Sequence, residues 1–490
     1  MLPTSVLTVP SPSSQVPLVV VKTAAAERLR RGGLTLRHDE LKTPAGPSLV
    51  GAAVRLTDER SRPLGTGLGA APGPTPLAIR LFDRGDVLLD DAELERRLQQ
   101  AAALRAALFR SDLGAARRAD RHADRHADRA EGSPSTGASA ATLRRDAYRL
   151  VHGEADGLPG LFIDRYGDAA VVQTATAAMD ARKGHIAALL RRRLGVTWVV
   201  CRDDGSARDV ESLPRERGIL LDERTAAEVS APRAGAAALD RSTVTTLASF
   251  HDAGSQMQAD LLHDRKTGSF LDQQDNHARA ADYAERFFPQ RSGRTATALD
   301  AFSYHGGFAL ALARSGLSVT ACDEDADAVA RARRNAALNR VSVDFRVENA
   351  FDLLRRLESQ GARFDVVVVD PPALAKRGRD RSSASAGAGA RPGERSGAGP
   401  RDENSPWARA YRELNLRAIR LLSPGGLLVS CSCSGRVSPA LFGEILQGAA
   451  ADARRSLQLL ERRGAGADHP VLVNFPESEY LKCWFLRALD

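Results

Sequence analysis

The C-terminal half of the chain alternates short apolar runs with longer segments of helical periodicity. An apolar run over residues 297–301 precedes a small-residue turn over 303–307 and an apolar segment over 308–315. Short apolar runs bounded by turn residues are typical of buried parallel strands, and the longer segment is typical of a buried helix. The pattern predicts a strand, a glycine-containing turn and a helix in succession.

The same alternation continues and predicts an open, doubly wound α/β sheet. Further strands are expected over 317–322, 341–347, 364–369 and 427–431, and a further helix over 326–338. Polar residues follow the predicted strands, namely Asp323, Asn349, Asp370 and Cys433. In such a sheet the carboxyl ends of the strands border the ligand crevice. We therefore expect a Rossmann-like domain with its binding site at this edge.

The turn and the first acidic strand end indicate the kind of ligand. Asp323 is placed to hold the two hydroxyls of a ribose. The turn contains only the adjacent Gly306 and Gly307, so it lacks the G-x-G-x-x-G spacing that lets the backbone clamp a pyrophosphate. S-adenosylmethionine (SAM) has an adenosine and a sulfonium but no phosphate, and it is the cofactor that this turn favours.

The N-terminal half predicts two smaller domains. Short β-type runs over 17–22, 48–56, 64–68 and 76–82 suggest a small β-barrel. A basic segment over 27–41 interrupts them; it reads as a solvated face or as a phosphate-contacting edge. Asp90 and Asp91 can cap a following helix. Two β-type runs around a turn at 157–160, a helix over 183–193 and a strand over 196–201 then predict a central α/β domain.

Low-complexity stretches separate these domains. The repeat over 119–129 places His122 and His126 four residues apart, as metal ligands could be, but no third ligand is nearby, so we expect a charged linker and no metal site. The Arg/Ser/Ala/Gly stretch over 377–406 is too polar to pack and is expected to be a disordered insertion. The predicted division is a tail (1–16), the barrel (17–88), a helix and linker (89–145), the central domain (146–225) and a C-terminal domain (240–490).

Composition and charge indicate the kind of partner and the cellular compartment. The formal charge of +8 over 490 residues favours a polyanionic partner, although an arginine-rich composition with no such partner is the alternative. The five cysteines contain no C-x-x-C pair, so neither a zinc site nor a disulfide framework is indicated. The first residues do not form a secretion signal, and no run is long and apolar enough to span a membrane. A cytoplasmic protein is expected.

Two strand-end residues carry the candidate chemistry. Prolines after Asp370 form a stiff turn that holds its carboxylate at the rim, and Ala373 stands where amine methylases have a stacking aromatic residue, which argues against amine methylation. Cys433 could add as a thiolate to carbon 6 of a pyrimidine, so that carbon 5 can attack a sulfonium methyl. The alternative for Cys431 and Cys433 is that both are small buried apolar residues.

Several long motifs in this order resemble one known family. They are RLVHGEADGLPGLFID (149–164), KTGSFLDQQDN (266–276), FSYHGGF (302–308), Asp370-Pro-Pro, Ser432-Cys-Ser-Gly, and Asp468-His-Pro through Tyr480-Leu-Lys482. The chain is identified on these motifs as similar to the bacterial class I SAM-dependent 23S ribosomal RNA cytosine-5 methyltransferases that carry an N-terminal PUA domain. The resemblance implies a PUA-like RNA-binding barrel, a central α/β domain and a Rossmann-like class I methyltransferase domain.

The resemblance also implies a role for each matching residue. Cys433 would be the nucleophile, and Asp370 would orient the cytosine edge and border the cofactor. The remaining cofactor-binding residues implied are Phe270, Asp272, Gln273, Phe302, Ser303, Tyr304, Gly306, Asp323, Asn349 and Ala350. The expected partner is 23S ribosomal RNA, naked or within a large-subunit assembly intermediate. The oligomeric state stays open, with a homodimer as one alternative.

Departures from the family pattern leave alternatives open. They occur at Gln274, His277, His305, Cys431 and Cys483. One alternative is methylation of another ribosomal nucleotide, such as guanine, by the same fold without a covalent step. The other is a non-catalytic RNA-binding or ribosome-assembly factor. The insertion over 377–406 is hypothesised to contact backbone phosphates beside the target.

Overall fold

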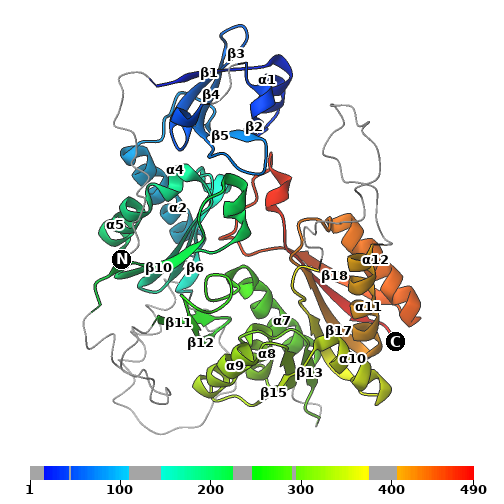
Figure 1. The fold of residues 1–490 in the computed structure, drawn as a ribbon. Coiled ribbons are helices and arrows are strands. Elements are labelled where there is room, and N and C mark those ends of the chain that lie inside the picture. Colours follow the sequence, from blue (N-terminus) through cyan, green and yellow to red (C-terminus); the bar gives the residue numbers. More distant parts are fainter. Residues whose placement is uncertain (1–15, 43–45, 110–144, 225–245, 290–293, 375–404) are drawn as a thin grey trace. The chain divides into compact units, whose positions relative to one another are not determined.

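The computed structural model describes residues 16–42, 46–109, 145–224, 246–289, 294–374 and 405–490 (Figure 1). Backbone contacts divide the chain into two compact units. Unit 1 comprises Met1–Gln274 and Gly466–Ser478, and unit 2 comprises Asp275–Ala465 and Glu479–Asp490. The predicted tail and repeat, and all but the last residues of the predicted insertion, lie outside the described residues. No described helix is long and apolar enough to cross a membrane.

The first part of unit 1 is a small β-sheet with one helix on it. In the described residues its strand order is β1-β3-β4-β5-β2. The strands are β1 (Leu18–Val21), β2 (Thr35–Arg37), β3 (Ala53–Asp58), β4 (Pro63–Gly69) and β5 (Leu77–Asp83). The helix α1 (Thr23–Arg30) buries Ala25, Ala26 and Leu29. The basic segment therefore contains the end of a helix and a short strand, which the sequence pattern did not predict.

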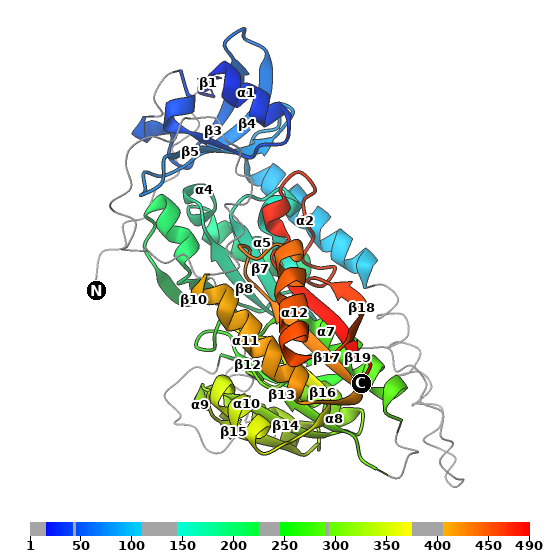
Figure 2. The same ribbon diagram turned by 90° about the vertical axis from the view of Figure 1, so that its right-hand side faces the viewer.

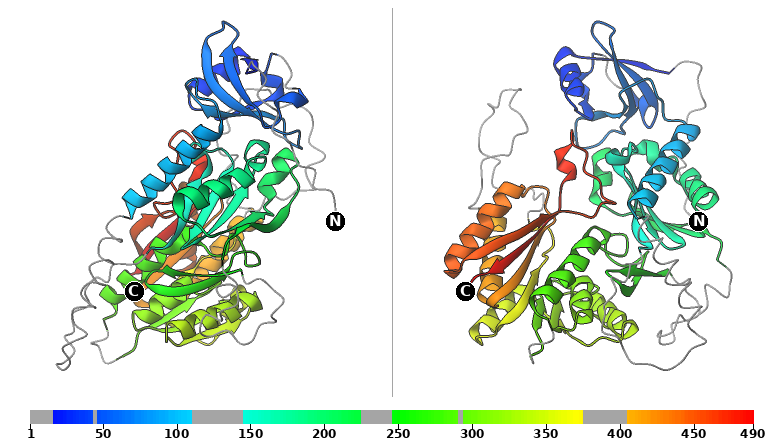
Figure 3. Two further views of the ribbon diagram at one scale, coloured as in Figure 1. Left: turned by 90° about the vertical axis from the view of Figure 1, so that its left-hand side faces the viewer. Right: turned by 180° about the vertical axis from the view of Figure 1, so that it is seen from behind.

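The second part of unit 1 is an α/β sheet. Its strand order, within the described residues, is β10-β9-β8-β7-β6. The strands are β6 (Ala147–His152), β7 (Leu161–Tyr166), β8 (Ala169–Thr174), β9 (Trp198–Asp203) and β10 (Glu216–Asp222). The helices α2 (Asp91–Leu108, light blue in Figure 3) and α5 (Lys183–Leu194) bury their apolar residues in one cluster with this sheet. The carboxylate of Asp90 caps α2 by accepting the Glu93 N–H, as the sequence predicts.

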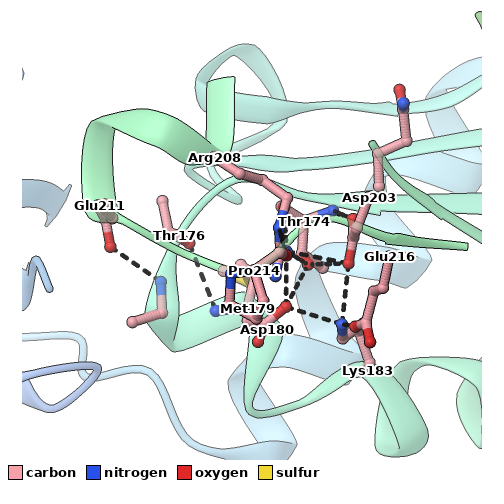
Figure 4. A network of polar contacts seen from close by, with 12 residues as sticks. Thr174, Thr176, Met179, Asp180, Lys183, Asp203, Arg208, Glu211, Pro214 and Glu216 are labelled. Carbon is pink, nitrogen blue, oxygen red and sulfur yellow. Dashed lines mark hydrogen bonds and ion pairs between the residues drawn. The ribbon is translucent and has the colours of Figure 1, made fainter. Parts of the chain in front are cut away.

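A buried ionic network ties β8, β9 and α5 together (Figure 4). Arg208, which is 2% exposed, pairs with Asp180 at 2.7 Å and with Asp203 at 3.0 Å. Cys201, Asp203 and Glu216 bring potential ligand atoms close together. However, the Lys183 ammonium pairs with both Asp203 and Glu216, so it supplies the positive charge that a metal ion would otherwise bring.

Two segments from outside the central domain complete unit 1. The hairpin of β11 (Leu247–Asp252) and β12 (Ser255–Asp260) is joined to it because His251 N–H donates to Asp146 at 2.8 Å. Thr267 donates to Asp164 at 2.6 Å. In the segment Gly466–Ser478, the Asp468 carboxylate accepts the Arg149 N–H at 2.8 Å. The contact boundary at Gln274 therefore differs from the predicted one at 240, and the three-domain division stays a proposal.

Unit 2 is the predicted doubly wound sheet. The described strand order is β15-β14-β13-β16-β17-β19-β18, and all pairs are parallel except those that β19 makes with β17 and β18. The strands are β13 (Thr297–Asp300), β14 (Ser318–Asp323), β15 (Val343–Val347), β16 (Phe364–Val369), β17 (Leu422–Ser432), β18 (Leu457–Arg463) and β19 (Lys482–Ala488). The Rossmann-like α/β prediction is confirmed.

Helices cover both faces of this sheet. The helices of unit 2 are α7 (Gln274–Phe287), α8 (Gly307–Arg314), α9 (Ala326–Leu338), α10 (Ala350–Ser359), α11 (Pro406–Arg420) and α12 (Pro439–Ala453). Side chains of α10, α11 and α12 share one apolar core with β16 and β17, and Figures 1 and 2 show α11 and α12 side by side. β17 begins at Leu422, before its predicted start, because strand pairing with β16 continues at Leu422 across a register shift at the Pro424–Gly426 stretch.

Candidate functional site

The carboxyl ends of β13, β14, β15, β16 and β17 are neighbours in the strand order of unit 2, and the candidate residues of that unit lie at these ends. The turn after β13 begins at Phe302 and leads into α8. Gly306 is the N-cap of α8 with φ +92°, a conformation that favours glycine. A Cβ on Gly307 would lie 2.2 Å from the His277 ring, so this position must also remain glycine. The close packing at Gly307 and the positive φ at Gly306 therefore favour glycine at both positions of the turn.

Side chains of this turn fit a polar ligand. Ser303 is 5% exposed, and its Oγ has no hydrogen-bond partner among the described residues. A buried hydroxyl without a partner costs free energy, so a ligand that bonds to it would be stabilised. Tyr304 is held at φ +45° with its ring stacked 3.7 Å from that of His305. Phe302 packs against the core and meets Phe351 edge-on at 6.5 Å.

The end of β14 is suited to a ribose. The carboxylate of Asp323 is half-buried and accepts the Tyr304 N–H at 2.9 Å and the Asp325 N–H at 3.0 Å. A carboxylate has about four lone-pair sites, so two acceptors remain for a pair of ribose hydroxyls. Because Tyr304 N–H binds it, the carboxylate is fixed in position against the glycine turn.

The end of β15 provides Asn349 and Ala350. Asn349 is exposed and caps α10 by accepting the Phe351 N–H at 3.0 Å, while its Nδ2 lies 3.4 Å from Glu324. One amide oxygen lone pair remains for an adenine amine. Ala350 begins α10, where backbone N–H groups have no partner within the helix. The adenine contact of Asn349 and the cofactor contact of Ala350 stay predictions.

Asp300 at the end of β13 is a buried acid that lies within the predicted strand over 297–301 and for which the sequence analysis predicted no role. It is 1% exposed and accepts the Ala309 N–H at 3.1 Å. Burial and, less strongly, the charge of Asp370 raise its pKa from 3.8 to about 7, while His277 acts in the opposite direction. No sequence motif identifies Asp300, because its raised pKa results from burial next to the end of a second strand, which only the folded structure brings close.

This raised pKa predicts a pH dependence of stability. Between pH 3.8 and about 7 the folded protein retains a proton on Asp300 that the unfolded chain has lost, so the free energy of unfolding falls as pH rises through this window. We expect Asp300→Asn to raise the melting temperature relative to wild type by a few degrees at pH 8 and by little at pH 4. Thermal melts with Asp327→Asn as control test this; a shift independent of pH would contradict it.

Cys433 and Asp370 come from the ends of adjacent strands. Cys433 follows β17, is half-buried, and its Sγ lies 3.9 Å from the carbonyl oxygen of Pro371 in the Asp370-Pro-Pro turn. Cys431, in contrast, is 1% exposed within β17. The two thiols differ in accessibility because the strand ends at Ser432, so Cys433 leaves the sheet. Of the two, only Cys433 is accessible to a substrate.

Tyr411 of α11 joins these two strand ends. Its hydroxyl accepts a hydrogen bond from Ser432 Oγ at 3.1 Å and one from the Leu374 N–H in the chain that follows Asp370-Pro-Pro. Burial raises the pKa of Tyr411 to about 12, and the charges of Cys433 and Asp370 act in the same direction. Tyr411 therefore stays protonated at neutral pH. Sequence reasoning missed it, because its contacts depend on long-range packing.

The remaining predicted cofactor residues belong to unit 1. Phe270 precedes a short 3₁₀ turn, Leu271–Gln273, that contains Asp272 and Gln273. Asp272 and Gln273 are buried, and the Lys266 ammonium lies 3.9 Å from the Asp272 carboxylate and 4.6 Å from the Phe270 ring centre. Their role in binding the cofactor stays a prediction.

Known proteins share this sequence and fold. A family profile described as conserved hypothetical protein 95 matches residues 285–378. Ribosomal RNA large subunit methyltransferase I of Klebsiella pneumoniae (strain 342) is 30% identical over 448 residues, covering 91% of each chain. The protein of the same name from Erwinia tasmaniensis is 32% identical over 348 residues, covering 70% of this chain and 75% of the relative.

Two solved structures share the fold at low sequence identity. The crystal structure of SMU.776 complexed with SAH has a TM-score of 0.66 at 17% identity and covers 96% of this chain and 100% of that chain. A protein from Streptococcus mutans assigned as a SAM-dependent methyltransferase has a TM-score of 0.64 at 16% identity, with the same coverage. These likenesses show the fold.

Fold and site together define a SAM-dependent methyltransferase with a Rossmann-like α/β domain. Its cofactor is SAM, as the glycine turn and Asp323 predict. The chain belongs to the ribosomal RNA large subunit methyltransferase I family. The predicted enzyme class and cofactor are confirmed, whereas cytosine-5 specificity and the PUA domain stay predictions.

Proposed function

We propose that this enzyme methylates carbon 5 of a cytosine in large-subunit ribosomal RNA through a covalent adduct with Cys433. The observation that supports this most directly is the position of Cys433, a half-buried thiol beside the Asp370-Pro-Pro turn. The names of the relatives supply the RNA class. A thiol at this point serves a pyrimidine-5 methylation, because carbon 5 needs activation, whereas a guanine methylation needs no nucleophile from the protein.

The residues of the chain perform the following steps. The Cys433 thiolate adds to carbon 6, and the electron pair of the carbon 5–carbon 6 double bond becomes available at carbon 5. When bound, SAM would supply the electrophilic methyl group for that carbon, its sulfonium becoming a neutral thioether as the S–CH3 bond breaks. Asp370, near the thiol, accepts a hydrogen bond from the exocyclic amine and orients the ring. After carbon 5 has been methylated, water acting as the base takes the proton from that carbon. The electron pair of the broken C–H bond restores the double bond and expels the Cys433 thiolate.

Unit 1 is proposed to bind the RNA. Its first sheet carries the basic segment over 27–41, in which Arg28 and Arg31 are both exposed, although Arg28 pairs with Glu40. Such cations suit phosphate contacts, which position a protein on RNA without reading its sequence. This supports the PUA-like assignment and the predicted RNA partner. A cytoplasmic location also stays a prediction.

The proposal is tested by identifying the methylated nucleoside. Large-subunit RNA transcripts incubated with the full chain and SAM are digested to nucleosides and analysed by mass spectrometry. We expect 5-methylcytidine to form with wild type and not with heat-inactivated protein. Methylguanosine as the product would overturn the proposal in favour of a non-covalent reaction, and SAM binding without any methylated nucleoside on naked RNA or on large-subunit assembly intermediates would also overturn it.

A further inference from the structure

Lys482, the first residue of β19, is a buried cation beside the proposed nucleophile. It is 2% exposed, and its Cα pairs with that of Ser432, the last residue of β17. Its Nζ donates to the carbonyl oxygen of Ser434 at 2.6 Å and to that of Tyr480 at 2.8 Å. These bonds place the ammonium against the backbone that immediately follows Cys433.

We infer that Lys482 is a positioning residue for Cys433. The positive charge of its ammonium stabilises the thiolate form of the Cys433 side chain. The inference rests on the proposed function and deepens it. When the thiol ionises, the S–H bond breaks, its electron pair stays on Sγ and the proton leaves to solvent, while Nζ retains its three hydrogens. No oxidant, reductant or further reactant is required.

Geometry and charge support this pairing. An ammonium has three donors, and the two carbonyl oxygens use two of them, so one N–H remains for a further acceptor. Buried lysines tend to lose their charge unless an anion compensates. Burial lowers the pKa of Lys482 to about 8, and the negative charges of Cys433 and Glu479 oppose this shift. The same attraction that favours the charged lysine favours the thiolate.

Three other ionisable groups interact electrostatically with Cys433, Tyr411 or Lys482, and none of the three supplies this positive charge. Tyr411 of α11, which is coupled to Cys433, stays protonated and neutral, and Asp370 after β16 is an acid. Glu479 precedes β19 and is exposed. Among these groups of the described chain, only Lys482 is cationic. A purely structural lysine would act only by binding the two carbonyl oxygens.

Thiol alkylation measures the pairing without RNA or SAM. The reaction rate of Cys433 with iodoacetamide, followed by peptide mass spectrometry, reports the thiolate fraction as pH is varied. The other four cysteines are buried, and Cys433→Ala measures their background. In wild type we expect the pH at which the alkylation rate inflects to lie below the pKa of a model thiol, about 8.5. An inflection at or above that value would overturn the inference.

Two variants separate charge from hydrogen bonding. Lys482→Gln retains a donor for the carbonyl oxygens but has no charge, so we expect the inflection to rise by about one pH unit and the rate at pH 7 to fall about tenfold. Lys482→Arg retains the charge and should restore most of the rate. Similar profiles for wild type and a folded Lys482→Gln would overturn the inference. If either variant fails to fold, the wild-type inflection alone decides.

The same experiment separates this inference from the proposed function. If wild type forms 5-methylcytidine and Lys482→Gln leaves the thiol profile unchanged, the pairing is wrong and the proposed function stands. If the profile shifts as expected but no methylated cytosine forms, the pairing stands and the proposed function fails.

Discussion

Replacing Cys433 with alanine is expected to abolish both covalent capture of RNA and methyl transfer. RNA that contains 5-fluorocytidine traps a cysteine adduct, because its carbon 5 carries fluorine in place of the proton that must be removed. Without that proton loss the thiolate cannot be expelled after methyl transfer. With SAM present, wild type should give a protein–RNA species that survives denaturing electrophoresis. Cys433→Ala should give none, and its methylation rate should fall roughly a thousandfold or more, as for removal of a catalytic nucleophile.

Cys431→Ala is the matched control for this result. Cys431 lies two residues earlier and is 1% exposed. In the strand register it lies opposite Cys483 of β19, and both are free cysteines. We expect the variant to retain the adduct and most of the activity, with at most a small loss of stability from the missing sulfur. An adduct that persists in Cys433→Ala, or one that disappears only in Cys431→Ala, would show that the nucleophile was assigned to the wrong residue.

The Rossmann-like sheet was predictable because its strands have strong local signals. Phe364–Val369 contains four consecutive valines and is buried throughout, and the predicted helix over 326–338 matches α9 in both bounds. The helix α1 gave no such signal. It is short, and its N-cap residue, Lys22, makes no side-chain capping bond, so neither periodicity nor a capping residue marks its start.

The positions of the residues at the strand ends were also predictable from local sequence, whereas the residues that contact them from distant segments were not. Asp323 ends β14 and Asp370 directly follows β16, so the local pattern places both at one edge of the sheet. Lys482 reaches Ser434 only because β19 pairs antiparallel with β17, a contact between segments far apart in the chain. Asp468 likewise binds Arg149 across most of the sequence. Local patterns do not contain such pairings.

Asp323 is expected to carry much of the affinity for SAM. Its carboxylate is held by Tyr304 N–H and Asp325 N–H and retains acceptors for two ribose hydroxyls. Hydrogen bonds to a charged group contribute about 1.5–3 kcal/mol each. Removing two of them in Asp323→Ala should therefore raise the dissociation constant of SAM about a hundredfold or more. Isothermal titration calorimetry measures this directly.

Two further variants determine whether the carboxylate itself is responsible. Asp323→Asn retains the size of the side chain and one acceptor oxygen for the turn, so a loss of affinity shared with Asp323→Ala assigns the effect to the charged acceptor. Asp344→Ala removes an acid from the same sheet, at the beginning of β15 and away from the carboxyl ends of the strands, and should bind SAM as wild type does. An Asp323→Ala protein that binds SAM within about threefold of wild type would exclude a ribose contact at this position, because a cofactor seated at the glycine turn could not lose these two bonds without weaker binding.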